Sequence, residues 1–152
     1  MWTFALATLC VLAVAAGSGA ASFAPDVVKA LETSKNLYVA TKRKDGTQSA
    51  VAPIWFMYDG QAVYFTTTPT SHKAKRIATG SPVLVWVGAE NGPHFVGKGE
   101  ILRDVETASA MAEKMAPVYD RKYWISWMGF FRPRPDRVRA GKTLIVRVTP
   151  GE

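Results

Sequence analysis

Two Asp-Gly pairs divide the first half of the chain into short segments that suit an antiparallel β-sheet. Asp45-Gly46 separates the apolar segments 37–41 and 50–57, and Asp59-Gly60 separates 50–57 from 62–68. Asp-Gly favours the tight turns that join neighbouring antiparallel strands. The sequence therefore predicts three strands that follow one another in an up-and-down meander.

The second half adds three more strand segments and a helix. Apolar residues run over 83–87, 95–102 and 143–148, whereas 25–34 and 107–119 have the composition and spacing of helices. About six short antiparallel strands interrupted by helices predict a small closed barrel, because closure removes exposed sheet edges. The expected fold class is therefore mainly β, with peripheral helices.

The N-terminal segment differs from the rest of the chain. Residues 2–22 carry no charge, and their apolar run over 4–16 is followed by small residues. This composition is typical of a signal peptide or an N-terminal apolar anchor, so we expect 1–22 to direct export or membrane anchoring and 23–152 to form one domain. No Lys or Arg precedes the apolar run, which leaves a cytoplasmic protein with a wrongly assigned start as the alternative.

The sequence predicts no metal site. The single cysteine, Cys10, lies in the N-terminal segment, so the remaining domain has no thiol for a disulfide or a metal. Neither His72 nor His94 has a Cys or a carboxylate nearby at the spacing of metal ligands.

The segment from Val63 to Val87 joins a threonine-edged strand to a basic turn. Ser71 is placed to cap a short helix, and Lys73 and Lys75 supply positive charge. A capped helix start with nearby cations is a combination that binds a phosphate monoester. A lysine run is also common on a solvated helix face, so the residues alone leave both interpretations open.

Three segments together resemble the flavin-binding split barrel of the pyridoxamine-phosphate-oxidase-like superfamily. They are NLYVATKRKDGTQSAVAPIWFMYDGQAVYFTTTPTSHKAKRIATGSPVLVWVG, GPHFVGKGEILRD and KTLIVRVTP, from Asn36 to about Pro150. The resemblance implies a six-stranded antiparallel split β-barrel that binds flavin mononucleotide (FMN). It also implies a homodimer, because the family's sites are built at the subunit interface, and a small-molecule substrate.

The resemblance assigns seven cofactor-binding residues. Ser71, His72 and Lys73 correspond to the positions that hold the flavin phosphate, and Thr66 and Thr67 to those that line the ribityl chain and ring. Lys75 adds positive charge, and Pro53 lies in the strand whose backbone follows the ring.

The chain departs from the family pattern at several of these positions. His72 stands where relatives often carry Arg, so its charge near neutral pH depends on its protonation. Ala50 and Trp55 stand where pyridoxamine-phosphate oxidases carry Arg and Lys, which argues against that vitamin-producing activity.

With these departures, the resemblance implies an FMN-dependent oxidoreductase of the compact branch of the superfamily. The first alternative keeps the fold and uses the related deazaflavin coenzyme, whose longer anionic tail would use Lys75, Arg76 and the arginines beyond Phe131. The second alternative is a non-catalytic cofactor carrier or a basic surface-binding protein.

Two further clusters have a structural and a functional interpretation. A group of aromatic residues could form a substrate slot over the ring, although core packing or a dimer interface is the commoner role of large aromatics: Trp55, Trp86, Trp124, Trp127, Phe130 and Phe131. The formal net charge is +7, and five cations cluster near the C-terminus: Arg132, Arg134, Arg137, Arg139 and Lys142. We interpret them as a basic loop that raises the potential around an anionic ligand. The alternative is weak association with anionic surfaces, and no nucleic-acid-binding motif accompanies the charge.

Overall fold

The computed structural model describes residues 21–124 and 131–151, and within them seven antiparallel strands form one sheet. The elements in chain order are α1 (Pro25–Thr33), β1 (Asn36–Thr41), β2 (Ala52–Trp55), β3 (Met57–Tyr58), β4 (Val63–Thr67), α2 (His72–Ala78), β5 (Pro82–Val87), β6 (His94–Ile101), α3 (Val105–Lys122), α4 (Pro135–Arg139) and β7 (Leu144–Pro150). Residues 1–20 of the predicted signal segment lie outside the described residues.

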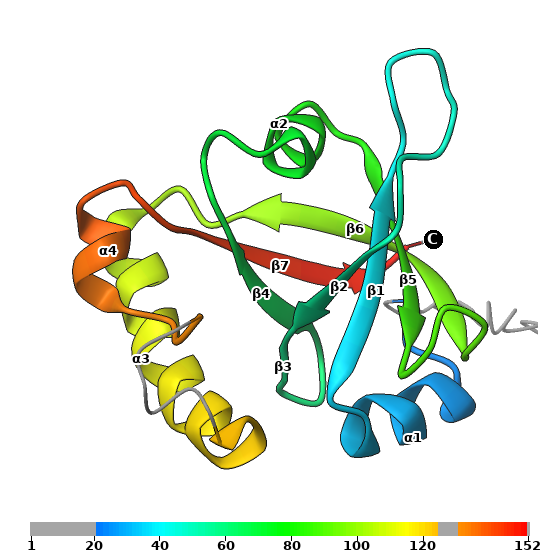
Figure 1. Ribbon diagram of the computed structural model, residues 1–152, viewed down its shortest axis with the longest axis horizontal. Helices are drawn as coiled ribbons and strands as arrows, with labels where there is room; N and C mark the ends of the chain where they lie inside the picture. The colour runs from blue at the N-terminus through cyan, green and yellow to red at the C-terminus, as the bar shows by residue number, and fades with distance from the viewer. Residues whose placement is uncertain (1–20, 125–130, 152) are drawn as a thin grey trace, which may run out of the picture.

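A single residue connects the two edges of the sheet. The strand order is β2-β1-β5-β6-β7-β4-β3, and only Phe56 separates β2 from β3 in the chain. The chain therefore leaves one edge of the sheet at Trp55 and joins the other at Met57, which closes the barrel (Figure 1). This confirms the predicted mainly β, antiparallel split barrel with peripheral helices.

The predicted number of six strands is wrong, because the structure divides the segment 50–57. Its first part pairs with β1 and its last residues pair with β4. Phe56, between them, is fully buried, and its N–H donates to the Tyr123 hydroxyl (3.0 Å) instead of to a neighbouring strand. The other five strands agree with the prediction within two residues.

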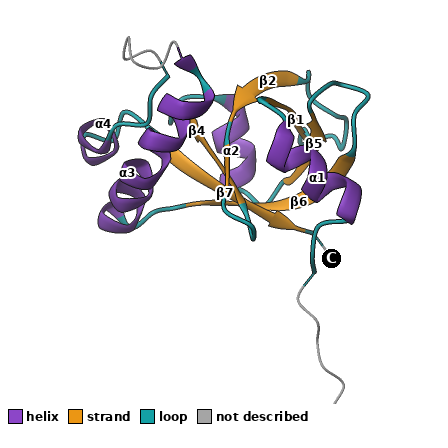
Figure 2. Cartoon of the chain, turned by 90° about the horizontal axis from the view of Figure 1, so that it is seen from below, coloured by secondary structure: helices purple, strands orange, loops and turns teal. Residues whose placement is uncertain are grey.

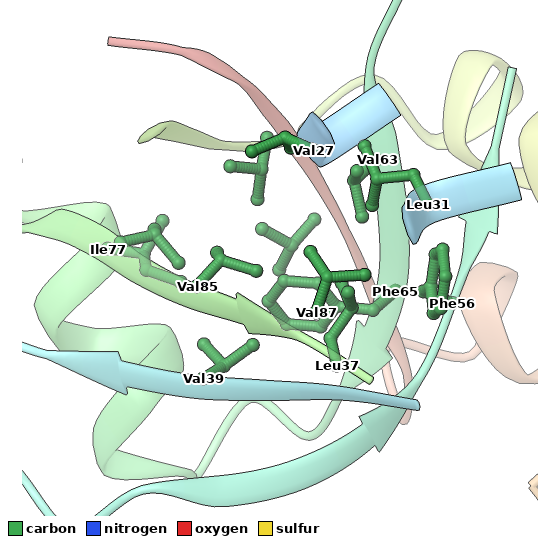
Figure 3. Close-up of a cluster of buried hydrophobic side chains, with 13 residues drawn as sticks. Val27, Leu31, Leu37, Val39, Phe56, Val63, Phe65, Ile77, Val85 and Val87 are labelled. Carbon is green, nitrogen blue, oxygen red and sulfur yellow. The ribbon is translucent and has the colours of Figure 1, made fainter. Parts of the chain in front are cut away.

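Alternation along each strand fills the barrel interior. On β4, Val63 and Phe65 are buried in the barrel core, whereas Tyr64 between them belongs to a second cluster under α3. Two residues of α1 four positions apart, Val27 and Leu31, join the barrel core (Figure 3). The first helix therefore covers one part of the barrel.

The helices α3 and α4 lie together on the opposite side of the barrel from α1 (Figure 2). The helix α3 is capped at its start by Asp104, whose carboxylate accepts from the Thr107 N–H (2.9 Å) and hydroxyl (2.6 Å). It is longer than the predicted 107–119 and contains Pro117 in its interior. Among the described residues, no helix is long and apolar enough to cross a membrane.

The helix α4 was not predicted, because its residues were interpreted as part of a basic loop. Pro135 occupies its first turn, a position where the missing N–H of proline costs no helical hydrogen bond. Val138 is buried in the cluster under α3, so packing against α3 stabilises a helix of only five residues.

Candidate cofactor-binding site

The turn between β4 and α2 is held by two hydroxyl groups. The Ser71 Oγ accepts from the Ala74 N–H (3.0 Å) and so caps α2, and it lies 2.9 Å from the Thr67 Oγ1. The predicted capping role of Ser71 is confirmed. If Thr67 donates in this pair, the Ser71 proton is free to donate to a bound oxyanion.

Lys73 is half-buried immediately after this cap. Its ammonium lies 5.6 Å from the centroid of the Phe65 ring, and burial lowers the pKa of Lys73 below its usual value. The four ion pairs among the described residues all use arginine as the cation. Because burial disfavours the charged ammonium, an anion bound here would stabilise it.

Thr66 and Thr67 line a cavity of ≈ 350 Å³, which we name the arginine cavity. Its described lining is Thr66, Thr67, Thr68, Phe131, Arg132, Arg134, Arg137 and Thr143. Three arginines of the predicted basic cluster therefore line the same cavity as Thr66 and Thr67, which were predicted to bind the cofactor. Sequence reasoning gave these arginines a general effect on potential or a role toward a deazaflavin tail, but it did not place them beside Thr66 and Thr67, because 64 or more residues separate them from Thr68.

Carboxylates hold two of the three arginines in place. The Arg132 guanidinium donates to both Asp120 carboxylate oxygens (3.0–3.2 Å), and Arg134 donates to those of Asp136 (2.8 and 3.1 Å). Arg137 belongs to none of the four ion pairs found in the described residues. It is therefore the arginine of the cavity best able to pair with a ligand.

His72 and Lys75 line a different cavity, of ≈ 690 Å³, which we name the hairpin groove. Its lining is Lys42, Arg43, Lys44, His72, Lys75, Arg76, Thr79, Gly80 and Ser81. Pro53 lines neither cavity and is exposed on β2 opposite Tyr38. The structure therefore divides the seven predicted residues among the turn, two cavities and the outside of the sheet.

An aromatic cluster lies beside the barrel closure. Trp55 stacks on Tyr123 with ring centroids 4.1 Å apart and an interplanar angle of 3°, and Phe131 meets the edge of Trp55 at 5.5 Å. The Tyr123 hydroxyl in turn accepts from the Phe56 N–H and donates to the Lys35 carbonyl oxygen. These hydrogen bonds hold Tyr123 in place, and Trp55 is held by stacking on it.

Only part of the predicted aromatic slot is brought together. Trp55 and Phe131 are in contact, and Trp124 and Phe131 are 73% and 74% exposed. Trp86 is in β5, and Trp127 and Phe130 lie outside the described residues. Sequence reasoning missed Tyr123, whose hydroxyl binds backbone groups 67 and 88 residues away in the sequence.

The half-buried position of Lys122 predicts that the stability of the folded protein depends on pH. Its Nζ donates to the Phe56 carbonyl oxygen (3.2 Å), and burial lowers the pKa of Lys122 to about 7. In the unfolded chain the pKa of a lysine is about 10.4. Above pH 7 the unfolded chain therefore binds more protons than the folded protein, and the contribution of Lys122 to the free energy of unfolding rises with pH.

We expect this effect in a comparison of the wild type with Lys122→Met. Between pH 7 and pH 9 the wild type should gain stability relative to the variant, because only the wild type carries the shifted group. Urea denaturation at several pH values measures the difference. A difference that is constant across this range would show that Lys122 keeps its usual pKa in the folded protein.

Within residues 21–124 and 131–151, no three His, Cys, Asp or Glu residues lie together in a way that could hold a metal ion.

The structure is a split β-barrel in which a hydroxyl-bearing turn lies next to cation-lined cavities. Residues 23–152 match the family model described as pyridoxamine 5'-phosphate oxidase. The chain therefore belongs to the pyridoxamine 5'-phosphate oxidase family, which confirms the resemblance seen in the sequence. No curated protein sequence matches the chain.

Solved structures share the fold at low sequence identity. An F420 reductase is 24% identical over 82% of this chain and 92% of its own, with a TM-score of 0.55. A FAD-binding protein from Mesorhizobium loti is 18% identical over 82% and 87%, with a TM-score of 0.60. The heme storage protein HutZ from Vibrio cholerae is 13% identical over 87% and 92%, with a TM-score of 0.57. At these identities the likeness establishes the fold.

Proposed function

We propose that this chain binds FMN at the turn between β4 and α2, and that the loaded protein is an oxidoreductase acting on a small organic molecule. The observation that carries the proposal is the half-buried Lys73, which belongs to none of the ion pairs of the described residues and follows the Ser71 cap. Membership of the pyridoxamine 5'-phosphate oxidase family supports a flavin-type cofactor.

The residues of the turn fit a phosphate monoester. Lys73 provides the charge, and the Ser71 hydroxyl provides a donor beside it. Thr66 and Thr67 line the adjoining arginine cavity, so we place the polyol part of the same ligand beside them, with the Thr67 hydroxyl also bonded to Ser71. Lys75 and His72, on the groove side of α2, add positive potential next to the turn.

The protein groups orient the cofactor, and the bound flavin itself supplies hydride and electron transfer. The Trp55 and Tyr123 stack, together with Phe131, forms an apolar surface near the barrel closure. We propose that an organic substrate reaches the flavin from the arginine cavity, where Phe131 and Arg137 offer one apolar and one cationic contact.

The second candidate cofactor is a deazaflavin, and the likeness to an F420 reductase is the observation that supports it. A non-catalytic role is the third possibility, since one protein of this fold is described as a heme storage protein. The colour of the purified protein separates these possibilities. A yellow protein that releases FMN on denaturation and bleaches with dithionite supports the proposal. A colourless protein that does not bind added FMN contradicts it.

The central prediction concerns Lys73. We expect Lys73→Gln to weaken FMN binding by about 1.5–3 kcal/mol, or about 10- to 150-fold in Kd, because it removes a charged hydrogen bond to phosphate. Titration of the apoprotein, followed by the quenching of flavin fluorescence, measures the Kd.

The matched control is Lys114→Gln, which removes the same charge from an exposed position on α3. It should leave the Kd within about twofold, because exposed charges at a distance are screened by salt. Riboflavin, which lacks the phosphate, should bind the wild type and Lys73→Gln with similar affinity. Equal FMN affinity of the wild type and Lys73→Gln would rule out the turn as the phosphate site.

We also propose a homodimer formed through the outer side of β2, β1, β5 and β6. Half-buried or exposed apolar side chains follow one another across these strands, and we name them the outer face: Pro53, Tyr38, Leu84, Trp86 and Val96. Tyr38 is paired in register with Trp86 and with Pro53, and Leu84 with Val96. Contiguous exposed apolar surface of this kind marks interaction sites.

A further inference from the structure

The hairpin groove has cations on two walls that come from distant parts of the chain. One wall is the projecting connection between β1 and β2, with Lys42, Arg43 and Lys44, and the other is α2, with Lys75 and Arg76. Both segments lie at the same end of the barrel (Figure 1). The cations therefore face a shared concave space of ≈ 690 Å³.

No carboxylate lines this groove. The acidic residue of the connection, Asp45, accepts from the N–H (3.0 Å) and hydroxyl (2.7 Å) of Thr47. Those hydrogen bonds also lower the pKa of Asp45, so it remains ionised and engaged in its own turn. None of the four ion pairs in the described residues includes a groove residue. Asp45 is close enough to Arg43 to offset part of its charge, whereas Lys42, Lys44, Lys75 and Arg76 form no ion pair within this part of the chain.

Hydrogen bonds fix the two walls relative to each other. The Lys42 N–H donates to the Ser81 Oγ (2.9 Å), which ties the start of the connection to the segment after α2. The Arg76 guanidinium donates to the Thr41 hydroxyl (3.4 Å), which ties α2 to the end of β1, whereas the Arg43 guanidinium donates to the Thr47 hydroxyl (3.2 Å) within the connection itself. The groove is therefore formed before any ligand binds, which lowers the cost of binding.

We propose that the hairpin groove is a second ligand site, which binds a small molecule carrying two or more phosphate groups. Its volume is that of a site for a small ligand, and several cations converge on it. No aromatic side chain other than His72 lines it, so it offers little surface for stacking nucleic-acid bases. The ligand is therefore an oligophosphate-bearing small molecule, and it binds independently of the phosphate proposed at Lys73.

Tripolyphosphate is the probe for this site. Isothermal titration calorimetry of the full chain saturated with FMN, or of the chain without FMN if none binds, should show one binding event. The double variant Lys42→Gln/Lys44→Gln should weaken it by at least about tenfold, since two charged contacts are lost. Both lysines lie outside the turn that we propose for FMN, so the double variant should retain the FMN affinity of the wild type.

Two controls make the result specific. The first is Lys29→Gln/Lys114→Gln, which removes two charges elsewhere and should leave the tripolyphosphate Kd within about twofold. The second is orthophosphate, which should bind at least about tenfold more weakly than tripolyphosphate, because it engages fewer cations.

Three results would overturn the proposal. They are no tripolyphosphate binding, equal weakening in both double variants, and displacement of tripolyphosphate by FMN. Displacement would show that the groove and the turn hold the same phosphate. Tight binding of single-stranded RNA that depends on Lys42 and Lys44, without binding of tripolyphosphate, would assign the groove to nucleic acid. If FMN does not bind at all while tripolyphosphate does, the proposed cofactor fails and the groove site stands.

Discussion

Replacing Phe56 with alanine is expected to lower the free energy of unfolding by about 3–5 kcal/mol. Phe56 is fully buried in the barrel core and lies between the two edge strands of the sheet. Its ring also contacts the Lys122 ammonium, 3.1 Å from the ring centroid. Removing the ring leaves a cavity at the closure of the barrel and removes that contact.

Urea denaturation followed by tryptophan fluorescence and by circular dichroism measures this loss. The matched control is Phe131→Ala, which removes the same ring from a residue that is 74% exposed and should cost less than about 1 kcal/mol. Phe56→Leu retains most of the apolar volume and should cost less than Phe56→Ala. Equal stabilities of the two alanine variants would show that the buried Phe56 ring does not stabilise the barrel core.

Trp86→Asp is expected to convert the proposed homodimer into a monomer. Buried aromatic residues near the centre of an interface contribute about 2–4 kcal/mol, so the dimer Kd should rise roughly 30- to 1,000-fold. Trp86 is paired in register with Tyr38 and His94, within the outer face. Sedimentation equilibrium of the wild type and the variant at micromolar concentration measures the change.

Val105→Asp provides the control for this experiment. Val105 is 46% exposed at the start of α3, away from the outer face, and its replacement should leave the dimer intact. Circular dichroism must show that Trp86→Asp remains folded, because a half-buried tryptophan also contributes to stability. A wild type that is monomeric at all concentrations, or a Trp86→Asp variant that still dimerises, would contradict the proposed interface.

Local patterns were sufficient to predict most of the elements. The Asp-Gly pairs and the alternation of apolar residues located five strands within two residues, because turn chemistry and side-chain period are properties of short segments. The break at Phe56 could not be predicted in this way. It arises because the chain exchanges β1 for β4 as its partner, and the Tyr123 hydroxyl that binds the Phe56 N–H lies 67 residues away.

The candidate site shows the same limit. The cap at Ser71 was predictable, because it depends on residues three and four positions apart. The division of the cations between two cavities was not predictable. Lys73 and Lys75 are two residues apart, but Lys75 lines the groove with Lys42 and Lys44, while the arginines beyond Phe131 accompany Thr66 and Thr67. That division depends on which segments the fold brings together: α2 lies beside the connection between β1 and β2, and the segment 131–143 lies beside the end of β4.

The position of β7 determines when the sheet can be completed during synthesis of the chain. It is the last described strand, yet it lies inside the sheet, paired with β6 on one side and with β4 on the other. Until residues 144–150 have left the ribosome, β4 and β6 present unpaired backbone groups along their length, and such edges are templates for intermolecular association. The nascent chain is therefore vulnerable to aggregation until β7 has emerged and filled the position between β4 and β6.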